Sequence, residues 1–232
     1  MSEALEKVKG ITQLPIFPLP LVLLPMEILP LHIFEPRYRE MLTDATTTNN
    51  LFGVHLFEPK EEFDTKPRPG SIGCVAEVRE VQPMEDGRSN ILTNGTIRYR
   101  LIDYVEIDKP YLVGEVEFFE DAIEDTIPQL KTADEVFSLF ERIAKAAFKM
   151  SGNRGPLPEI ERADPEPMSF LVTAAFNFDN AKKYRLLEME STTKRLKSLK
   201  KMLVHAADQM EASAEITEIA KTNGHSKKKI DL

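Results

Sequence analysis

The sequence has one cysteine and no tryptophan, and the cysteine count excludes two kinds of stabilising site. Cys74 alone cannot form an intramolecular disulfide, and it cannot supply the set of thiolates that a structural zinc ion needs. A chain of 232 residues needs neither, because a chain of this length buries roughly 70–75% of its unfolded surface. We therefore expect a core stabilised by packing, in a reducing compartment.

Long uninterrupted apolar runs are also absent. The most apolar stretch, residues 14–34, is interrupted by five prolines and by Glu27, so it cannot form an unbroken helix across a bilayer. The first seven residues have neither the basic-then-apolar order of a secretory signal nor the acid-poor composition of a transit peptide. We expect a cytoplasmic protein without a membrane partner.

Positive charge is in short supply. Asp and Glu number 38 against 30 Lys and Arg, which gives a formal net charge of -8. Affinity for nucleic acid comes mostly from clustered cations that release counterions from the phosphate backbone. The charge balance therefore argues against nucleic acid as a partner.

Motifs of catalysis and of cofactor binding are missing as well. The sequence has no phosphate-binding loop, no dinucleotide glycine pattern, no His-Glu-x-x-His and no Gly-x-Ser-x-Gly. Its four histidines lie far apart, without the spacing of metal ligands. Cys74 could pair with His32 or His55, but it alternates with Ile72 and Ala76 and so is typical of a strand's apolar core face. We predict no catalytic residue, no metal, no cofactor and no enzymatic activity.

The sequence divides near residue 125 into two halves with different patterns of apolar residues. The first half alternates in short apolar runs between Pro and Gly, which predicts strands. Asp86-Gly87 predicts a hairpin turn, and Gly95, inside a strand, predicts a bulge or a close backbone approach. Pro36 predicts the start of a helix that ends near Ala45. The predicted strands are 14–19, 28–34, 51–58, 71–81, 91–105 and 111–119.

The second half has helical periodicity. Thr132 begins a capping box, which predicts a helix to about Lys149. Further helices are predicted at 167–176, 180–189 and 192–210. The fold class is α+β, with a flexible N-terminus at 1–12, a β-rich lobe at 13–125, a helical lobe at 126–210 and a disordered tail at 211–232.

Five segments of the sequence stand out, namely 14–38 (LPIFPLPLVLLPMEILPLHIFEPRY), 68–78 (RPGSIGCVAEV), 94–101 (NGTIRYRL), 164–171 (DPEPMSFL) and 186–196 (LLEMESTTKRL). The third contains a Gly-x-x-Arg-x-Arg pattern. Together these segments resemble the N-terminal substrate-recognition domain of the Lon proteases. They occur in the family's order, and the resemblance spans about residues 12–205.

The resemblance implies a PUA-like β pseudo-barrel followed by a helical bundle. It also implies a non-catalytic, free-standing form of that domain, without the ATPase and Ser-Lys peptidase domains of a Lon protease. One departure is the sequence Leu24-Pro-Met-Glu, which replaces the common Pro-Gly of the family and leaves the geometry of this turn open.

The leading functional hypothesis is therefore a polypeptide-binding module that acts as an adaptor or regulator in protein quality control. We expect its partners to be unfolded or partly unfolded polypeptides, and a separate protease or an assembly partner. A groove between the two lobes would hold the segment, with Phe34, Tyr38 and Phe57 as its lining. The alternative is small-molecule or RNA binding by a PUA-like barrel.

Overall fold

The computed structural model describes residues 2–59, 65–151 and 159–223, with side chains described up to residue 217. The chain forms two compact units. The first, called the barrel unit here, comprises Met1–Ala122 and Phe170–Glu190, and the second, the helical unit, comprises Ile123–Ser169 and Ser191–Leu232. The predicted α+β class is confirmed. The lobe limits drawn from the sequence stay predictions.

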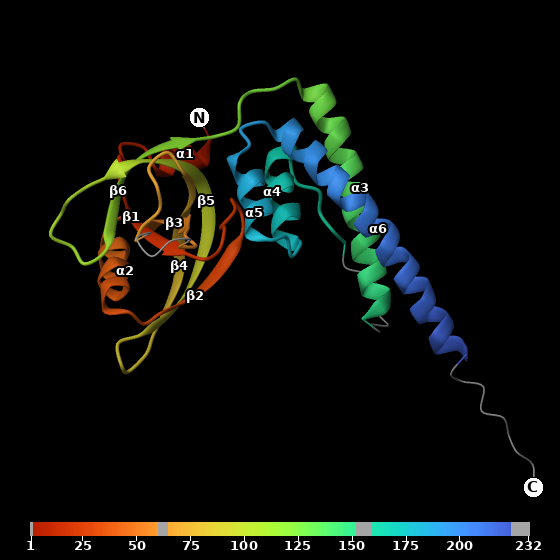
Figure 1. Ribbon diagram of the computed structural model, residues 1–232, viewed down its shortest axis with the longest axis horizontal. Helices are drawn as coiled ribbons and strands as arrows, with labels where there is room; N and C mark the ends of the chain where they lie inside the picture. Colours follow the sequence, from red (N-terminus) through yellow and green to blue (C-terminus); the bar gives the residue numbers. More distant parts are fainter. Residues whose placement is uncertain (1, 60–64, 152–158, 224–232) are drawn as a thin grey trace, which may run out of the picture. The chain divides into compact units, whose positions relative to one another are not determined.

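The barrel unit is built on one mixed sheet of six strands, in the order β2-β5-β4-β3-β1-β6 (Figure 1). A further pairing of β5 with β6 closes five of the strands into a ring, and β2 lies outside this ring on the first half of β5. β1 and β3 are parallel and the other neighbours are antiparallel. All six predicted strands are found, with ends within about two residues of the prediction. They are β1 (Gln13–Leu19), β2 (Ile28–Ile33), β3 (Leu51–Leu56), β4 (Ile72–Pro83), β5 (Ser89–Tyr104) and β6 (Leu112–Phe119).

Backbone geometry at three positions shapes the turn between β4 and β5 and the contact of β5 with the segment before β2. Gly87 has φ +80 in the turn between β4 and β5, as the predicted hairpin requires. A Cβ at Gly95 would lie 2.1 Å from the Leu24 carbonyl oxygen, which confirms the predicted close approach. Met26 takes a left-handed φ of 68 and donates its N–H to the Gly95 carbonyl. Met26 thus adopts a backbone conformation that favours glycine, in the turn where the family commonly has Pro-Gly.

The interior of the ring is organised around Tyr99, which is fully buried. A Cβ at Gly53 or at Gly73 would lie within 2.6 Å of the Tyr99 side chain, so glycine at these two strand positions makes room for the ring. Cys74 is buried in the apolar core, as its alternation with Ile72 and Ala76 predicted.

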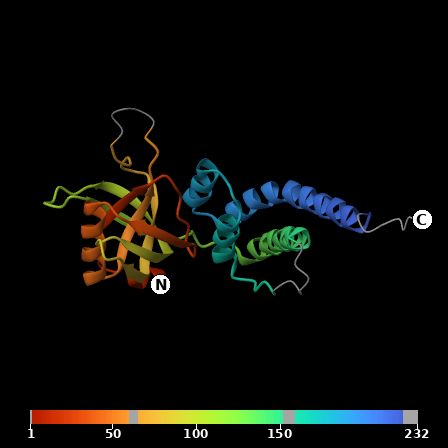
Figure 2. The same ribbon diagram turned by 90° about the horizontal axis from the view of Figure 1, so that it is seen from below.

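The first half of the chain also contains two helices. α1 (Glu3–Lys7) begins after Ser2, whose hydroxyl accepts from the Leu5 N–H, and Val8 is buried just beyond it. The N-terminal segment predicted to be flexible therefore contributes a side chain to the core. α2 (Pro36–Thr48) starts at the predicted proline and continues past Ala45. It packs along one side of the barrel (Figure 1 and Figure 2).

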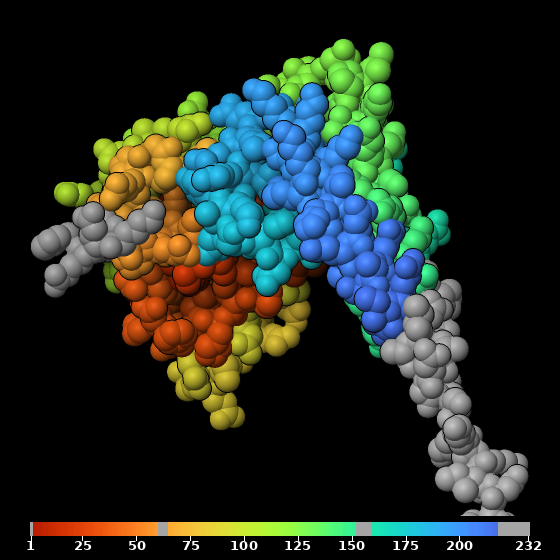
Figure 3. All heavy atoms as spheres, turned by 45° about the vertical axis from the view of Figure 1, so that its right-hand side comes forward, coloured from red at the N-terminus to blue at the C-terminus, as the bar shows by residue number. Residues whose placement is uncertain are grey.

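The segment from Phe170 to Glu190 belongs to the barrel unit and contains α5 (Asn180–Glu188). In the space-filling view α5, in cyan, lies directly against the red and orange surface of the barrel (Figure 3). The Tyr184 hydroxyl accepts from the Ile72 N–H at 2.9 Å, and the Asn180 amide donates to the Pro20 carbonyl at 2.9 Å. Side-chain bonds at both its first and middle turns therefore fix α5 on the barrel. α4 (Pro165–Ala175) begins in the helical unit and ends in the barrel unit.

The helical unit consists mainly of α3 (Thr126–Met150) and α6 (Thr192–Asn223), which run side by side in the same direction (Figure 1 and Figure 2). The predicted start of α3 at Thr132 is wrong. Asp125 is the N-cap, its carboxylate accepts from the Ile127 N–H, and Pro128 is tolerated in the first turn.

The predicted end of α6 at Met210 is also wrong, because the helix continues to Asn223. Ala214 extends its buried face, and Arg142 of α3 pairs with Glu211 at 2.7 Å. Residues 211–223 are thus helical rather than a disordered tail. Residues 224–232 of the predicted tail, and 152–158 between α3 and α4, lie outside the described residues.

A candidate polypeptide-binding site

The three side chains predicted to line a binding groove meet in one depression of about 550 Å³ on the barrel unit. Phe34 lies between β2 and α2, Tyr38 lies in the first turn of α2, and Phe57 follows β3. The depression, called the aromatic depression here, is formed entirely by residues of the barrel unit. The expected groove between the two lobes stays a prediction. The remaining lining consists of apolar side chains with a few polar and charged ones, namely Phe17, Pro18, Leu19, Pro20, Leu31, His32, Ile33, Glu35, Arg37, Thr65, Lys109, Pro110, Tyr111 and Leu112.

The aromatic side chains of this depression differ in accessibility. Phe34 is 57% exposed, and its ring stacks on the exposed ring of His32 at 5.9 Å. Tyr38 is only 8% exposed, its ring lies 4.2 Å from that of Phe17, and burial raises the pKa of its hydroxyl. Phe57 is half-buried. Phe34 is therefore free to contact another molecule, whereas Tyr38 belongs to the packed floor.

The charges at the rim of the aromatic depression are paired. The Lys109 ammonium lies 2.7 Å from Asp44 and 3.2 Å from Glu40, and the Tyr111 hydroxyl donates to Asp44 at 2.5 Å. The bond from Lys109, then that from Tyr111, lowers the pKa of the Asp44 carboxyl. Burial, then the same carboxylate, raises the pKa of Tyr111 to about 12. This network ties the loop between β5 and β6 to α2, so that one wall of the depression is fixed.

His55 is fully buried inside the barrel and does not pair with Cys74. One ring nitrogen lies 3.1 Å from the Tyr99 hydroxyl and the other lies 2.8 Å from the Ser71 hydroxyl, which donates to the Arg68 carbonyl. Burial lowers the pKa of His55 to about 4 and raises that of the Cys74 thiol well above its usual value. His55 is therefore a neutral imidazole close to two hydroxyl groups, and Cys74 is a protonated thiol. Both side chains have structural roles.

A second depression of about 540 Å³ shares Phe57 with the first. It lies where α5 meets the ends of β3 and β4, and its lining includes Lys66, Arg68, Asn180, Tyr184 and Arg185. We call it the basic depression. Sequence reasoning missed these residues. No local pattern could have found them, because the site exists only where a helix from the second half meets the barrel.

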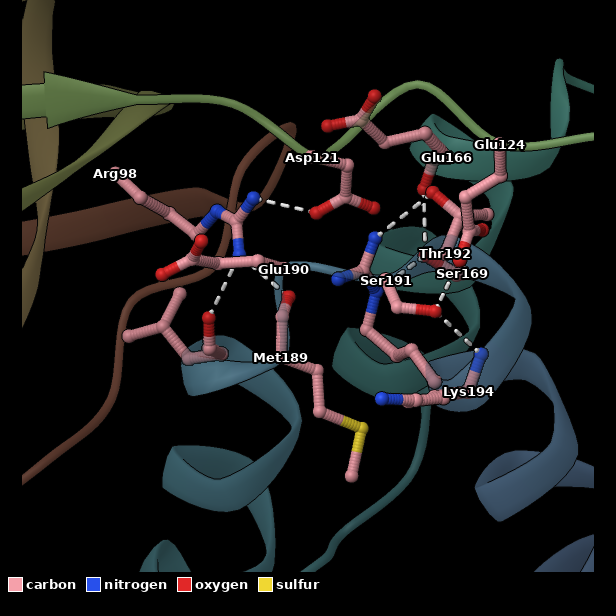
Figure 4. Close-up of polar contacts among 12 residues, drawn as sticks. Arg98, Asp121, Glu124, Glu166, Ser169, Met189, Glu190, Ser191, Thr192 and Lys194 are labelled. Atoms are coloured by element: carbon pink, nitrogen blue, oxygen red, sulfur yellow. Dashed lines mark hydrogen bonds and ion pairs between the residues drawn. The ribbon is translucent and has the colours of Figure 1, made fainter.

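The Gly-x-x-Arg-x-Arg pattern is explained by structure rather than by ligand binding. Arg98 is 1% exposed, and its guanidinium donates to the carbonyls of Leu187 (3.0 Å) and Met189 (2.7 Å) and to the Asp121 carboxylate (2.5 Å; Figure 4). It also lies 4.6 Å from the centre of the Phe119 ring. Arg98 therefore anchors the C-terminal end of α5 on β5.

The helical unit has a buried guanidinium of its own. Arg195 of α6 donates to the Ser169 hydroxyl at 2.7 Å, and Ser169 appears in the same close-up (Figure 4). Glu124 accepts from the Thr193 N–H at 2.8 Å and so caps the first turn of α6. These bonds fix the start of α6 against the segments before α3 and inside α4.

The described residues contain neither a cluster of metal ligands nor a membrane-spanning helix. No group of three or more His, Cys, Asp or Glu side chains within 2–59, 65–151 and 159–223 is placed to hold a metal ion. None of the helices in these ranges combines the length and the apolar character needed to cross a membrane.

A closed barrel of short strands, extended by helices and carrying an aromatic depression, places the chain among α+β domains of the pseudo-barrel class. Residues 13–205 match the family of the ATP-dependent protease La (LON) substrate-binding domain. The match covers most of the chain, and the chain belongs to this family.

Curated relatives include Lon proteases of several bacteria. The chain is 32% identical to a Lon protease of Parabacteroides distasonis over 155 residues, which is 65% of this chain and 18% of that protein. It is 22% identical to Lon protease 2 of Herpetosiphon aurantiacus over 156 residues, which is 67% of this chain and 19% of that protein. The chain thus spans about a fifth of the length of these relatives.

Solved structures with the same fold include a Lon N-terminal domain protein from Xanthomonas campestris. The TM-score is 0.60 at 24% identity, over 82% of this chain and 97% of that one. The N-terminal domain of a Lon protease from the Mycobacterium avium complex has a TM-score of 0.61 at 18% identity, over 83% of this chain and 98% of that one.

Proposed function

We propose that the chain binds unfolded or partly unfolded polypeptide segments at the aromatic depression, as a non-catalytic recognition module in cytoplasmic protein quality control. In this role it is an adaptor or regulator that presents segments to a separate protease or to an assembly partner. Phe34 is the main contact, with Phe57 beside it and Tyr38 in the floor.

The observation that carries the proposal is an exposed aromatic side chain above a preformed apolar hollow. Phe34 is 57% exposed, and its neighbours in the depression are mostly apolar. Leaving such a side chain in water costs free energy that burial by a partner recovers, and aromatic side chains at the centre of an interface often dominate its binding energy. An unfolded chain offers the apolar side chains that would fill the hollow. The membership of the substrate-binding family supports the same choice of ligand.

The test is a binding titration with a labelled, permanently unfolded polypeptide, for which reduced and carboxymethylated α-lactalbumin serves. Phe34→Ala should weaken binding by roughly 5- to 30-fold, which corresponds to about 1–2 kcal/mol. The matched control is Ile28→Ala, because Ile28 of β2 is 65% exposed and does not line the depression. Equal losses in the two variants, or equal binding of native and unfolded α-lactalbumin, would reject the proposal.

The second candidate, a small molecule or RNA, has one observation in its favour. A volume of about 550 Å³ lies within the range of small-ligand sites, roughly 300–1,000 Å³. The net charge of -8 opposes RNA. Filter binding of labelled RNA at low salt would detect even weak phosphate contacts, and the polypeptide proposal predicts no retention there.

A further inference from the structure

We infer that the polypeptide binds at the aromatic depression in an extended conformation, as a short additional strand that is hydrogen-bonded to the free edge of β2 at His32. This inference rests on the proposed function. It adds the conformation of the bound segment, and it makes recognition depend in part on the backbone that all polypeptides share.

The first step of the argument is that β2 is an edge strand. It stands at the end of the strand order, outside the closed ring, and β5 is its one partner among the described strands. An edge strand leaves a row of backbone N–H and C=O groups with which another chain can pair. The last residues of β2, Leu31 to Ile33, line the aromatic depression. The free edge of β2 therefore reaches the proposed binding site.

The second step identifies the backbone groups that face away from β5. Gly95 donates its N–H to the Glu27 carbonyl at 2.8 Å, and this pair continues the register of β2 on β5, which has no shift. Hydrogen-bonded and non-hydrogen-bonded pairs alternate along an antiparallel ladder. Because Glu27 is bonded to β5, Pro30 and His32 direct their backbone groups away from it. Pro30 agrees with this assignment, since proline occurs where a strand has no ladder bond to donate.

The outward backbone groups suit a short added strand. They are the N–H and carbonyl of His32 and the carbonyl of Pro30. One residue of an antiparallel ligand can exchange two hydrogen bonds with His32, and a second residue can donate to the Pro30 carbonyl. Pairing beyond Pro30 would leave a ligand carbonyl without a donor, because proline has no N–H. We therefore expect the added strand to end before Ile28.

The opposite wall of the depression offers fewer partners. Leu19 of β1 faces β3, because its carbonyl accepts from the Phe57 N–H at 2.8 Å. Backbone directions alternate along a strand, so Pro18 faces away from β3, and it has no N–H to donate. β2 is therefore the edge that can both donate to a ligand and accept from it.

The free edge lies beside the side chain proposed as the main contact. The rings of His32 and Phe34 are 5.9 Å apart, and both are exposed. Side chains of neighbouring strands contact one another directly and diagonally, so a strand paired with His32 brings its own side chains to Phe34. Backbone pairing then supplies affinity, and the apolar hollow selects the side chain, as in other cases of strand addition.

Hydrogen exchange measured by NMR on the isotope-labelled full chain tests the pairing directly. The probe is an acetylated and amidated nine-residue peptide with a central Phe and alternating Thr and Val. The His32 N–H should exchange about tenfold more slowly when the peptide is bound. The Leu31 N–H, which faces β5, should be protected with and without peptide. The Ile28 N–H, which lies beyond Pro30, should exchange fast in both states.

A pair of variants isolates the backbone donor. His32→Pro removes the outward N–H, and His32→Ala is the matched control, because it removes the same ring and keeps the N–H. The peptide should bind His32→Pro about two- to tenfold more weakly than His32→Ala, as expected for the loss of one hydrogen bond. Protection of the Leu31 amide shows whether β2 stays on β5 in each variant. If it does not, the wild-type exchange result decides.

The outcomes separate the two proposals. If the peptide binds and Phe34→Ala weakens it, but the His32 N–H stays unprotected, the added strand is rejected and the proposed function stands. The inference also fails if the His32 N–H is already protected in the free chain, or if folded His32→Pro and His32→Ala bind equally. If the peptide does not bind the wild-type chain the inference fails, and if unfolded α-lactalbumin does not bind either, the proposed function fails with it.

Discussion

His55 is held neutral inside the barrel by burial. Its ring nitrogens lie near the Ser71 and Tyr99 hydroxyl groups, which donate to the Arg68 and Val54 carbonyls. A protonated ring would place its charge in an apolar interior. The folded state therefore opposes protonation of His55.

This opposition predicts a pH dependence of stability. The pKa of His55 falls from an ordinary 6.5 to about 4 on folding, so the unfolded chain binds the extra proton between these values. Stability is fully present above pH 6.5 and is lost as the pH falls toward about 4, by up to about 3 kcal/mol. Denaturant unfolding at several pH values measures the slope.

His55→Gln should remove this part of the slope, whatever its effect on stability at pH 7. His32→Gln should retain it, because His32 is exposed at the end of β2. A wild-type slope that is unchanged in His55→Gln would show that other groups cause the acid sensitivity.

Some single residues could be predicted from sequence and others could not. Gly95 was predicted as a bulge or a close backbone approach, because glycine in a strand interior is typical of both. Cys74 was predicted as a core residue because it alternates with apolar neighbours. Phe34, Tyr38 and Phe57 do lie in one depression, yet only the structure distinguishes the exposed Phe34 from the packed Tyr38. No sequence signal placed Arg185 in a depression, because the sequence does not distinguish it from other exposed arginines on helices.

At the scale of elements, the attachment of α5 to β5 depends on one buried guanidinium. Arg98→Met should destabilise the chain by about 3–5 kcal/mol, because it removes a buried cation from the Asp121 carboxylate and from two carbonyls at the end of α5. Arg100→Met is the matched control from the same motif. Its pair with Glu190 at 3.1 Å is partly exposed, so its loss should cost roughly 0–1 kcal/mol.

Guanidinium chloride unfolding of the two variants measures the difference. Similar losses in both would mean that the motif contributes through strand packing and not through the anchor of α5.

Strands were easier to predict than helix ends. Apolar residues alternate with polar ones along the two longest predicted strands, and Asp86-Gly87 lies between them. These two signals are enough to place β4 and β5. The start of α3 was missed because Thr132 has capping-box spacing, whereas the N-cap is Asp125 and Pro128 is tolerated in the first turn. The end of α6 was missed because Ala214 is too small to continue a visible apolar stripe, and because the contact of Arg142 with Glu211 joins residues far apart in sequence.

At the scale of the whole molecule, the closed ring depends on pairings that no local pattern reveals. β1 pairs with β3 in parallel. β6, the last strand in the sequence, pairs with β1, the first. The period of two places residues on a face but does not choose a neighbouring strand. The resemblance to the Lon domain implied a pseudo-barrel but not which strands pair. Residues 170–190, grouped with the helical lobe from periodicity, pack as part of the barrel unit.

In the proposed function, the aromatic depression of the barrel unit is the place where polypeptide binds. The depression is preformed, because Tyr38 and Phe17 pack beneath it and Lys109 and Tyr111 are tied to Asp44 beside it. Preformed sites avoid part of the entropic cost of binding. The unfolded ligand still loses its own conformational freedom, so we expect modest affinity for any one segment.

The most direct test of this account is site-specific photocrosslinking to the unfolded polypeptide. Benzoylphenylalanine is placed at Phe34 in the aromatic depression, at Ile28 of β2, or at Leu130 of α3, all of which are exposed. The account predicts strong crosslinking to unfolded α-lactalbumin from position 34, little from positions 28 and 130, and little to the native protein. Equal crosslinking from all three positions, or crosslinking mainly from position 130, would contradict it.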